Sequence, residues 1–143
     1  MKQIITAVLL IVLFSSCSQE LERVSENDFV GKWELSGRKI LNGIQVSIQE
    51  ENGKLIGRIV KLNDNKYVRF FTEIDDVWIT EISRSSNYQF KLKEKRMGND
   101  FFALYGLETV ENYKVEFIDQ STIGLSKFGS DPRKSEIRYN KIE

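Results

Sequence analysis

The stretch QVSIQEENGKLIGRIV, residues 45–60, decides the fold class of this chain. Apolar Val46 and Ile48 alternate with polar neighbours, which is the two-residue period of a strand buried on one face. Asn52 and Gly53 then supply the two positive φ angles that a type I′ hairpin turn requires. The stretch therefore predicts an antiparallel β-hairpin.

The same two-residue period continues toward the C-terminus, with turn residues between the periodic segments. Eight to ten short strands are expected, near residues 31–37, 44–50, 54–62, 67–72, 76–83, 88–96, 101–109, 113–118, 121–128 and 135–142. A meander of this length must protect its edge strands, and closure into a barrel does so. We predict an all-β domain, an antiparallel meander closed into a barrel, with a two-sheet sandwich as the alternative.

The composition narrows the function classes. The chain has 143 residues, the size of one domain, and its 21 basic residues balance 21 acidic ones, so no basic excess is present for nucleic-acid binding. It contains no histidine and one cysteine, which removes the usual general base, a disulfide within the chain and a thiolate zinc site. We predict a chain that is not an enzyme and that uses no cofactor, no metal and no nucleic acid.

The N-terminus has the pattern of a secretory signal. Lys2 precedes an apolar run, residues 4–14, and small Ser15 and Ser16 lead to Cys17. The run is too short to span a bilayer, which takes about 20 residues; the alternative is a buried N-terminal strand or helix. The end of the run resembles the lipobox of bacterial lipoproteins, in which the cysteine takes a diacylglycerol and the signal is cut just before it.

This resemblance implies lipidation at Cys17 and a stable anchor, because several acyl chains hold a protein where one does not. Ser18 after the cysteine favours the outer membrane of a bacterial envelope, with the domain facing the periplasm or the cell surface. The expected segments are a signal peptide (1–16), a lipidated cysteine and tether (17–28) and a barrel domain (29–143). The tether is expected to end in a helical turn capped by Ser25 or Asn27.

The stretch FVGKWELSG, residues 29–37, carries a second resemblance. Gly31 and Trp33 at the start of the first strand resemble the opening of lipocalins and fatty-acid-binding proteins, the calycin barrels. In those barrels the tryptophan plugs the closed end and a cation of the last strand crosses its ring, which implies Arg138 or Lys141 here. Residues 46–62 also resemble the second hairpin of a small secreted bacterial domain family of unknown function, thought to be lipocalin-like.

Four residues are candidates for ligand binding. Arg58 and Arg69 each lie in an alternating stretch; in an apolar lumen such a guanidinium needs a carboxylate or phosphate partner, and fatty-acid-binding proteins hold acid head groups in this way. The alternative is a surface charge, with neighbours such as Gly57 facing inward. Tyr88 and Tyr105 offer hydroxyl groups to a ligand, or else they fill the core.

Two further features have local interpretations. Trp78 lies in a stretch that is partly apolar on both faces, which indicates a position at a rim or an interaction patch. Glu73, Asp75 and Asp76 form an acidic cluster, but the stretch lacks the glycine and the terminal glutamate of a calcium loop. A solvated turn is the favoured interpretation of the cluster.

Two function hypotheses remain open. In the first, a lipid-anchored envelope lipoprotein binds a small, mostly apolar ligand in its barrel, with arginine or tyrosine orienting a polar end. In the second, a barrel packed by its own side chains is a structural or interaction lipoprotein that binds a protein partner. The first needs a lumen of about 300 Å³ or more, and the second needs large inward side chains in contact and an apolar outer patch.

Overall fold

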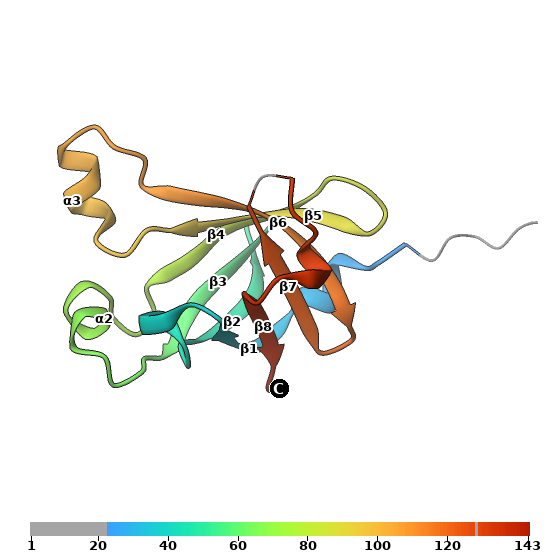
Figure 1. Ribbon diagram of the computed structural model, residues 1–143, viewed down its shortest axis with the longest axis horizontal. Coiled ribbons are helices and arrows are strands. Elements are labelled where there is room, and N and C mark those ends of the chain that lie inside the picture. Colours follow the sequence, from blue (N-terminus) through green and yellow to red (C-terminus); the bar gives the residue numbers. More distant parts are fainter. Residues whose placement is uncertain (1–22, 128) are drawn as a thin grey trace, which may run out of the picture.

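The computed structural model describes residues 23–127 and 129–143, which form a closed antiparallel barrel of eight strands (Figure 1). The strands are Gly31–Ser36 (β1), Gln45–Glu51 (β2), Lys54–Lys61 (β3), Val77–Arg84 (β4), Gln89–Lys95 (β5), Val110–Asp119 (β6), Thr122–Ser126 (β7) and Arg138–Lys141 (β8). Each strand pairs with its sequence neighbours, and β8 returns to β1 with Lys141 opposite Trp33. The predicted all-β barrel is confirmed, and the sandwich alternative is wrong.

Five short helical segments accompany the strands. They are the 3₁₀ turns Glu26–Phe29 (η1), Lys39–Leu41 (η2) and Pro132–Lys134 (η3) and the α-helices Lys66–Phe71 (α2) and Asn99–Leu104 (α3). The Ser25 side chain accepts a hydrogen bond from Asn27 N at 3.2 Å and caps η1. The helical turn expected at the end of the tether is therefore present, with Ser25 as its cap.

Two of the predicted strands are wrong. Residues 67–72 lie in α2 and the segment that follows it, and residues 101–109 contain most of α3. The strands that flank each segment already pair directly with one another, β3 with β4 and β5 with β6, so neither segment has a vacant position in the barrel. Asn65 also starts α2 locally, because its side chain accepts from the backbone of Tyr67 and Val68.

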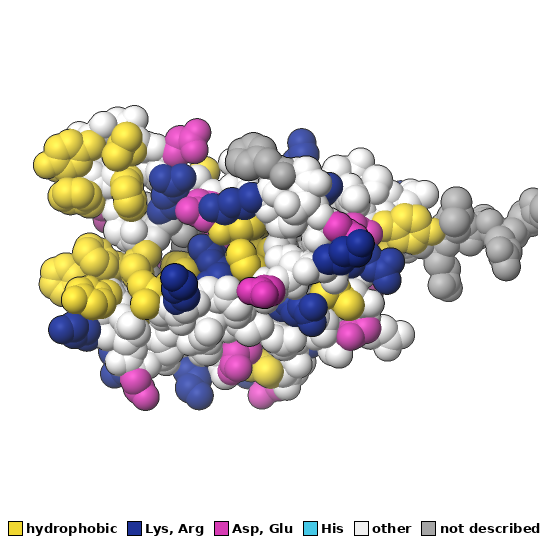
Figure 2. All heavy atoms as spheres, in the orientation of Figure 1, with side chains coloured by type: hydrophobic (Ala, Val, Ile, Leu, Met, Phe, Trp, Pro, Cys, Tyr) yellow, Lys and Arg dark blue, Asp and Glu magenta, His cyan; other side chains and the backbone are white. Residues whose placement is uncertain are grey.

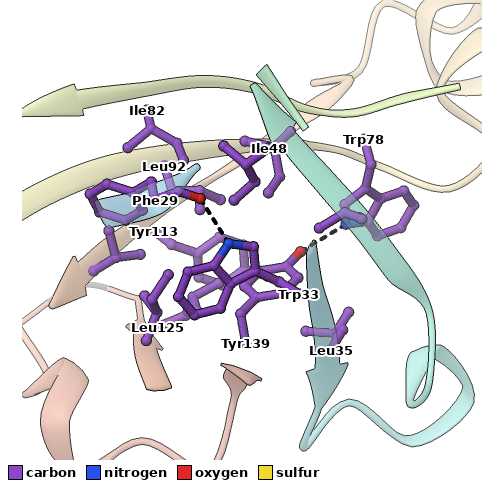
Figure 3. Packing of buried hydrophobic residues seen from close by; sticks show 14 of the residues in the cluster. Phe29, Trp33, Leu35, Ile48, Trp78, Ile82, Leu92, Tyr113, Leu125 and Tyr139 are labelled. Carbon is purple, nitrogen blue, oxygen red and sulfur yellow. Dashed lines mark hydrogen bonds between the residues drawn. The ribbon is translucent and has the colours of Figure 1, made fainter. Parts of the chain in front are cut away.

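Large side chains fill the barrel interior (Figure 3). Phe29 enters from η1 and packs its ring 4.7 Å from the rings of both Phe90 and Phe117, and Trp33 Nε1 donates to the Phe29 carbonyl at 2.8 Å. The largest fully buried side chains are Trp33, Tyr139, Phe29, Phe90, Leu35, Ile44, Ile48, Ile59, Ile79, Leu92, Ile123 and Leu125. Interdigitated packing of this kind replaces an open lumen with a solid core.

The two ends of the barrel differ. The β1–β2, β3–β4 and β5–β6 connections carry η2, α2 and α3, and we call the end where they lie the barrel mouth. The opposite end holds the short hairpin turns and the start of the described chain, where Val24 N donates to the Asn87 carbonyl in the β4–β5 turn at 3.1 Å. Figure 1 shows α2 and α3 at one extreme of the molecule and the incoming chain at the other.

Candidate binding site at the barrel mouth

A buried carboxylate lies inside the barrel mouth. Glu94 on β5 continues the inward face of Phe90 and Leu92, and only 1% of it is exposed. Its two carboxylate oxygens accept hydrogen bonds from the Tyr139 hydroxyl and from Arg38 Nη1. Trp78 Nε1 in turn donates to the Tyr139 hydroxyl at 3.0 Å (Figure 3). Glu94 is therefore buried and has a hydrogen-bond partner on each carboxylate oxygen, as a buried polar group requires.

Arg38 reaches across the mouth to this carboxylate. It follows β1, whereas Glu94 belongs to β5, four strands away around the barrel. Burial opposes the charge of Arg38, but Glu94, Tyr113 and Tyr139 together outweigh it and raise the pKa of the guanidinium. Burial, together with Glu94, likewise raises the pKa of Tyr139 well above its usual value, so the hydroxyl remains a donor.

A second carboxylate, Glu111 on β6, lies close to three cations of the mouth, Arg38, Arg96 and Lys127. It accepts from the Tyr113 hydroxyl at 2.5 Å and pairs with Lys127 Nζ at 2.9 Å, and nitrogens of Arg38 and Arg96 lie 3.6 Å from its oxygens. Burial opposes its charge, but the hydrogen bonds from Tyr113 and Lys127 prevail, so the pKa of Glu111 lies below its usual value. The neighbours of Glu111 therefore favour its charged form.

Arg96 is left with an unmet hydrogen-bonding group. Within the described residues, its Nε is the one buried side-chain polar atom without a hydrogen-bond partner. Its guanidinium lies over the Phe102 ring, 5.8 Å from the centroid, which holds the group in place. A buried donor without an acceptor costs about 1–3 kcal/mol. An acceptor supplied by a ligand would remove that cost.

Arg96 lines a hollow of about 250 Å³ in the mouth. The lining residues are Arg38, Leu41, Trp78, Lys95, Arg96, Met97, Phe102 and Glu111. With Glu94 beneath and Lys127 beside Glu111, this inner hollow is surrounded by four cations, Arg38, Lys95, Arg96 and Lys127, against two carboxylates. Asp76 and Asp100 lie farther out in the mouth. The positive excess and the unmet donor both favour an anion, and the apolar walls favour an attached apolar body.

A second hollow, about 160 Å³, continues the first between α2 and α3. The two hollows share Trp78, Lys95, Arg96 and Met97, while Phe71, Asp76, Asn99 and Asp100 line the outer part. The base of α3 touches α2 here, because Gly98 packs against the Phe71 ring. A molecule held at Arg96 would therefore extend outward between the two helices.

A larger hollow of about 570 Å³ lies at the opposite end of the barrel, beside the start of the described chain. Its lining includes Asp28, Asp119 and Lys141. The Lys141 ammonium is already engaged, 5.2 Å from the Trp33 ring and 3.3 Å from the Asp28 carbonyl. We therefore place the candidate site at the mouth, where a buried donor lacks a partner, and not in this larger groove.

The four predicted ligand-binding residues do not come together. Arg58 points outward, and its guanidinium binds Glu51 at 2.8 and 3.0 Å. The surface-charge alternative is the correct one because Gly57 faces inward, where an added Cβ would meet Ile79 at 2.9 Å. Arg69 lies on α2 instead of a strand and pairs with Asp64 at 2.7 Å.

The two tyrosines are likewise separated from one another. Tyr88 lies in the β4–β5 turn at the end opposite the mouth, and 39% of it is exposed. Tyr105 follows α3 at the mouth end, where it packs on Phe101 with 4.9 Å between ring centroids, and 65% of it is exposed. Both tyrosines lie at the surface, so the structure does not bring the four candidates together, and their role in ligand binding stays a prediction.

The predicted barrel-floor motif is present with one correction. Trp33 is fully buried, and Gly31 has φ +139°, where an added Cβ would lie 2.6 Å from the Glu143 carbonyl. The cation over the indole is Lys141, at 5.2 Å, and not Arg138, whose Nε donates to the Ser135 carbonyl. Side chains alternate along β8, so Lys141 shares the inward face with the buried Tyr139, whereas Arg138 lies on the outward face.

The remaining expectations have clear outcomes. Trp78 is buried with 2% exposed, so it lines the mouth and does not form an outer patch. Asp76 Oδ2 accepts from Glu73 N at 2.8 Å, which is the local bond of a turn. In the described residues, no group of three acidic or cysteine side chains is placed to hold a metal ion. Cys17 lies outside those residues.

Sequence reasoning missed Arg38, Glu94, Arg96 and Glu111. A usable signal existed for Glu94 and Glu111, because each continues an apolar inward face by the two-residue period. An ionisable residue in the buried phase of a strand indicates either a partner or a site. The side chain of Arg38 offers no such signal, since its loop position does not reveal which strand it reaches.

No helix among residues 23–127 and 129–143 has the length and apolar character needed to cross a membrane. Comparison of the chain with protein-family models, with curated proteins and with solved structures found no significant match.

Proposed function

We propose that this chain is a lipid-anchored binding module of the bacterial envelope, with a lipocalin-like barrel that takes a small amphipathic ligand at its mouth. The ligand's anionic group binds Arg96, and its mostly apolar body lies between α2 and α3. The observation that carries the proposal is the buried Arg96 Nε, which has no hydrogen-bond partner and only a long ion pair to Glu111 at 3.6 Å, in a hollow of about 250 Å³. Binding without catalysis agrees with a sequence that has no histidine.

The filled core determines the depth of the proposed site. Trp33, Leu35 and Tyr139 are fully buried in the barrel, and Arg38 bridges to Glu94 above them. A ligand can therefore reach no deeper than the Arg38–Glu94 pair, and its apolar end lies near α2 and α3. The proposal thus differs from a deep luminal site of the kind first expected from the sequence.

The first experiment is native mass spectrometry, followed by organic extraction, on the chain from Ser18 onward. We expect a small molecule bound in stoichiometric amount. Anilinonaphthalene sulfonate, an anionic amphiphile, serves as a defined probe of the empty site. Arg96→Gln should weaken its binding about tenfold or more, because a hydrogen bond to a charged group contributes about 1.5–3 kcal/mol.

Arg58→Gln is the matched control, since Arg58 is an arginine of the barrel wall that lies outside the mouth and is paired with Glu51. It should leave both the bound mass and the probe affinity unchanged. Equal affinities in wild type and Arg96→Gln, together with the absence of any bound small molecule, would contradict the mouth site.

The second candidate function is that of a packed barrel that binds a macromolecular partner. Two observations favour it: the interior is filled, and the two helices at the mouth expose large apolar side chains such as Phe70 and Leu104. This function needs no ligand in the hollow, so a clean apo mass with unchanged probe binding in Arg96→Gln would favour it over the first.

A further inference from the structure

The barrel mouth is flanked by two exposed apolar surfaces. Figure 2 shows them as hydrophobic side chains gathered over α2 and α3 at one end of the molecule. We call them the apolar lips and define them as Tyr67, Phe70, Phe71 and Ile74 on the α2 side and Phe101, Leu104, Tyr105 and Leu107 on the α3 side. Between 47% and 80% of each of these residues is exposed.

Each lip is as large as the largest apolar patch of an ordinary monomer, which is about 300–600 Å². With about 200 Å² for a large side chain, the exposed fractions correspond to about 500 Å² on each side and to apolar surface on the order of 1,000 Å² for both lips together. One side of a standard protein interface buries about 800 Å². The lips therefore have the area of one complete partner surface.

We propose that the lips of one chain pack against the lips of a second copy. Exposed charges lie on both sides: Lys66 on α2, with the acids 73, 75 and 76 in the turn after it, and Asp100 and Glu108 on and after α3. A two-fold axis that sets α2 of one copy against α3 of the other brings Lys66 toward Asp100 and Glu108 twice. Arg69 does not enter this count, because Asp64 already pairs with it at 2.7 Å.

The position of the N-terminus is compatible with this dimer. Val24 lies at the end of the barrel opposite the lips, so pairing through the lips places the two incoming chains at the far ends of the dimer. The six residues from Ser18 to Arg23 span up to about 20 Å when extended, more than the roughly 13 Å radius of gyration of a 100-residue domain. Two predicted anchors can therefore enter one membrane when the dimer lies along it.

Sedimentation equilibrium of the chain from Ser18 onward, which contains the whole closed barrel, tests the proposal. We expect a dimer in the micromolar range. Phe70→Ser combined with Leu104→Ser should give a monomer with an unchanged circular dichroism spectrum, because both side chains are at least 79% exposed and carry no core contact to lose. Val60→Ser combined with Ile142→Ser, two apolar residues exposed elsewhere, should remain dimeric.

A charge exchange distinguishes specific pairing from general stickiness. Lys66→Glu should weaken the dimer, and the addition of Asp100→Lys and Glu108→Lys should restore it. A wild-type chain that stays monomeric over the whole range, or a dimer that survives the loss of Phe70 and Leu104, overturns the proposal. A monomer that sediments with phosphatidylglycerol vesicles through its lips would also overturn it, in favour of a lipid surface.

Cross-linking of the full chain in its host membrane gives a second readout. Phe70→Cys and Leu104→Cys chains expressed together should yield a disulfide-linked dimer, because the axis sets α2 of one copy against α3 of the other. Val60→Cys expressed with either of them, and the chain without an added cysteine, should not. The inference rests on the lips and is independent of the Arg96 hollow. A dimer without a bound ligand therefore contradicts only the mouth site, and a ligand-bound monomer contradicts only the dimer.

Discussion

Glu94 organises the mouth of this barrel. Its carboxylate is almost completely buried, and it is tolerated because Arg38 and Tyr139 both donate to it. Removal of one partner from a buried ion pair leaves the other charge without compensation. The strongest single-residue effects on stability in the mouth are therefore expected at this pair.

Glu94→Ala should lower the free energy of unfolding by about 3–5 kcal/mol, the usual cost of breaking a buried ion pair. Urea denaturation measures it. Glu81→Ala is the control, because the pair of Glu81 with Lys93 at 2.7 Å is partly exposed and should contribute far less to stability than the buried pair. Arg38→Met combined with Glu94→Leu removes both charges and should cost less than Glu94→Ala alone; equal losses in all three variants would contradict this account.

The pKa of Glu111 is expected to make the stability of the barrel depend on pH. Its pKa in the folded chain lies below the ordinary value of 4.5, owing to its hydrogen bonds from Tyr113 and Lys127. A carboxyl with a lowered folded pKa binds protons more readily in the unfolded chain. Its contribution to stability is thus fully present above about pH 4.5 and is lost as the pH falls through the lowered folded value.

The measurement is the free energy of unfolding as a function of pH on the acid side. Wild type should lose stability as the pH falls below the ordinary glutamate range, and Glu111→Gln should show a shallower dependence there, because the substituted side chain does not titrate. Parallel curves for the two proteins would show that Glu111 does not carry this dependence.

At the scale of elements, α2 and α3 lie in connections between strands that already pair directly with one another, so the barrel closes without them. Lys95 on β5 pairs directly with Val110 on β6, so the residues between them make no strand ladder. Short segments that are apolar on both faces do not reveal their secondary structure by periodicity alone. This is why residues 67–72 and 101–109 were predicted as strands, although the hairpins around them were predicted correctly.

Replacement of residues 97–108 by a short turn should leave the barrel folded, because Lys95 and Val110 remain opposite one another. The shortened chain should unfold cooperatively, and it should lose dimerisation because it lacks the whole lip on the α3 side. Far-ultraviolet circular dichroism and sedimentation measure the two properties. An unfolded product would show that α3 belongs to the folding unit.

At the scale of the whole molecule, the two ends of the barrel have separate tasks. Phe29, Trp33 and Lys141 close one end, next to the incoming chain. The mouth at the other end gathers the cations, the hollow and the apolar lips. A module anchored at its N-terminus would present the mouth away from its anchor or along the membrane surface.

The sequence by itself determined the all-β class and the hairpin turns, because these follow from periodicity and from Asn-Gly pairs. The place of Trp33 at the barrel floor was implied by the resemblance to calycin barrels, and the lack of histidine follows from the composition. Only the tertiary structure decided which face of each strand is inward, that Lys141 and not Arg138 crosses Trp33, and that Arg38 reaches Glu94. These outcomes depend on strand register and on contacts between residues far apart in the chain, such as the 56 positions that separate Arg38 from Glu94. A local sequence pattern does not indicate which distant residues come into contact, so the mouth and the lips could be identified only from the closed barrel.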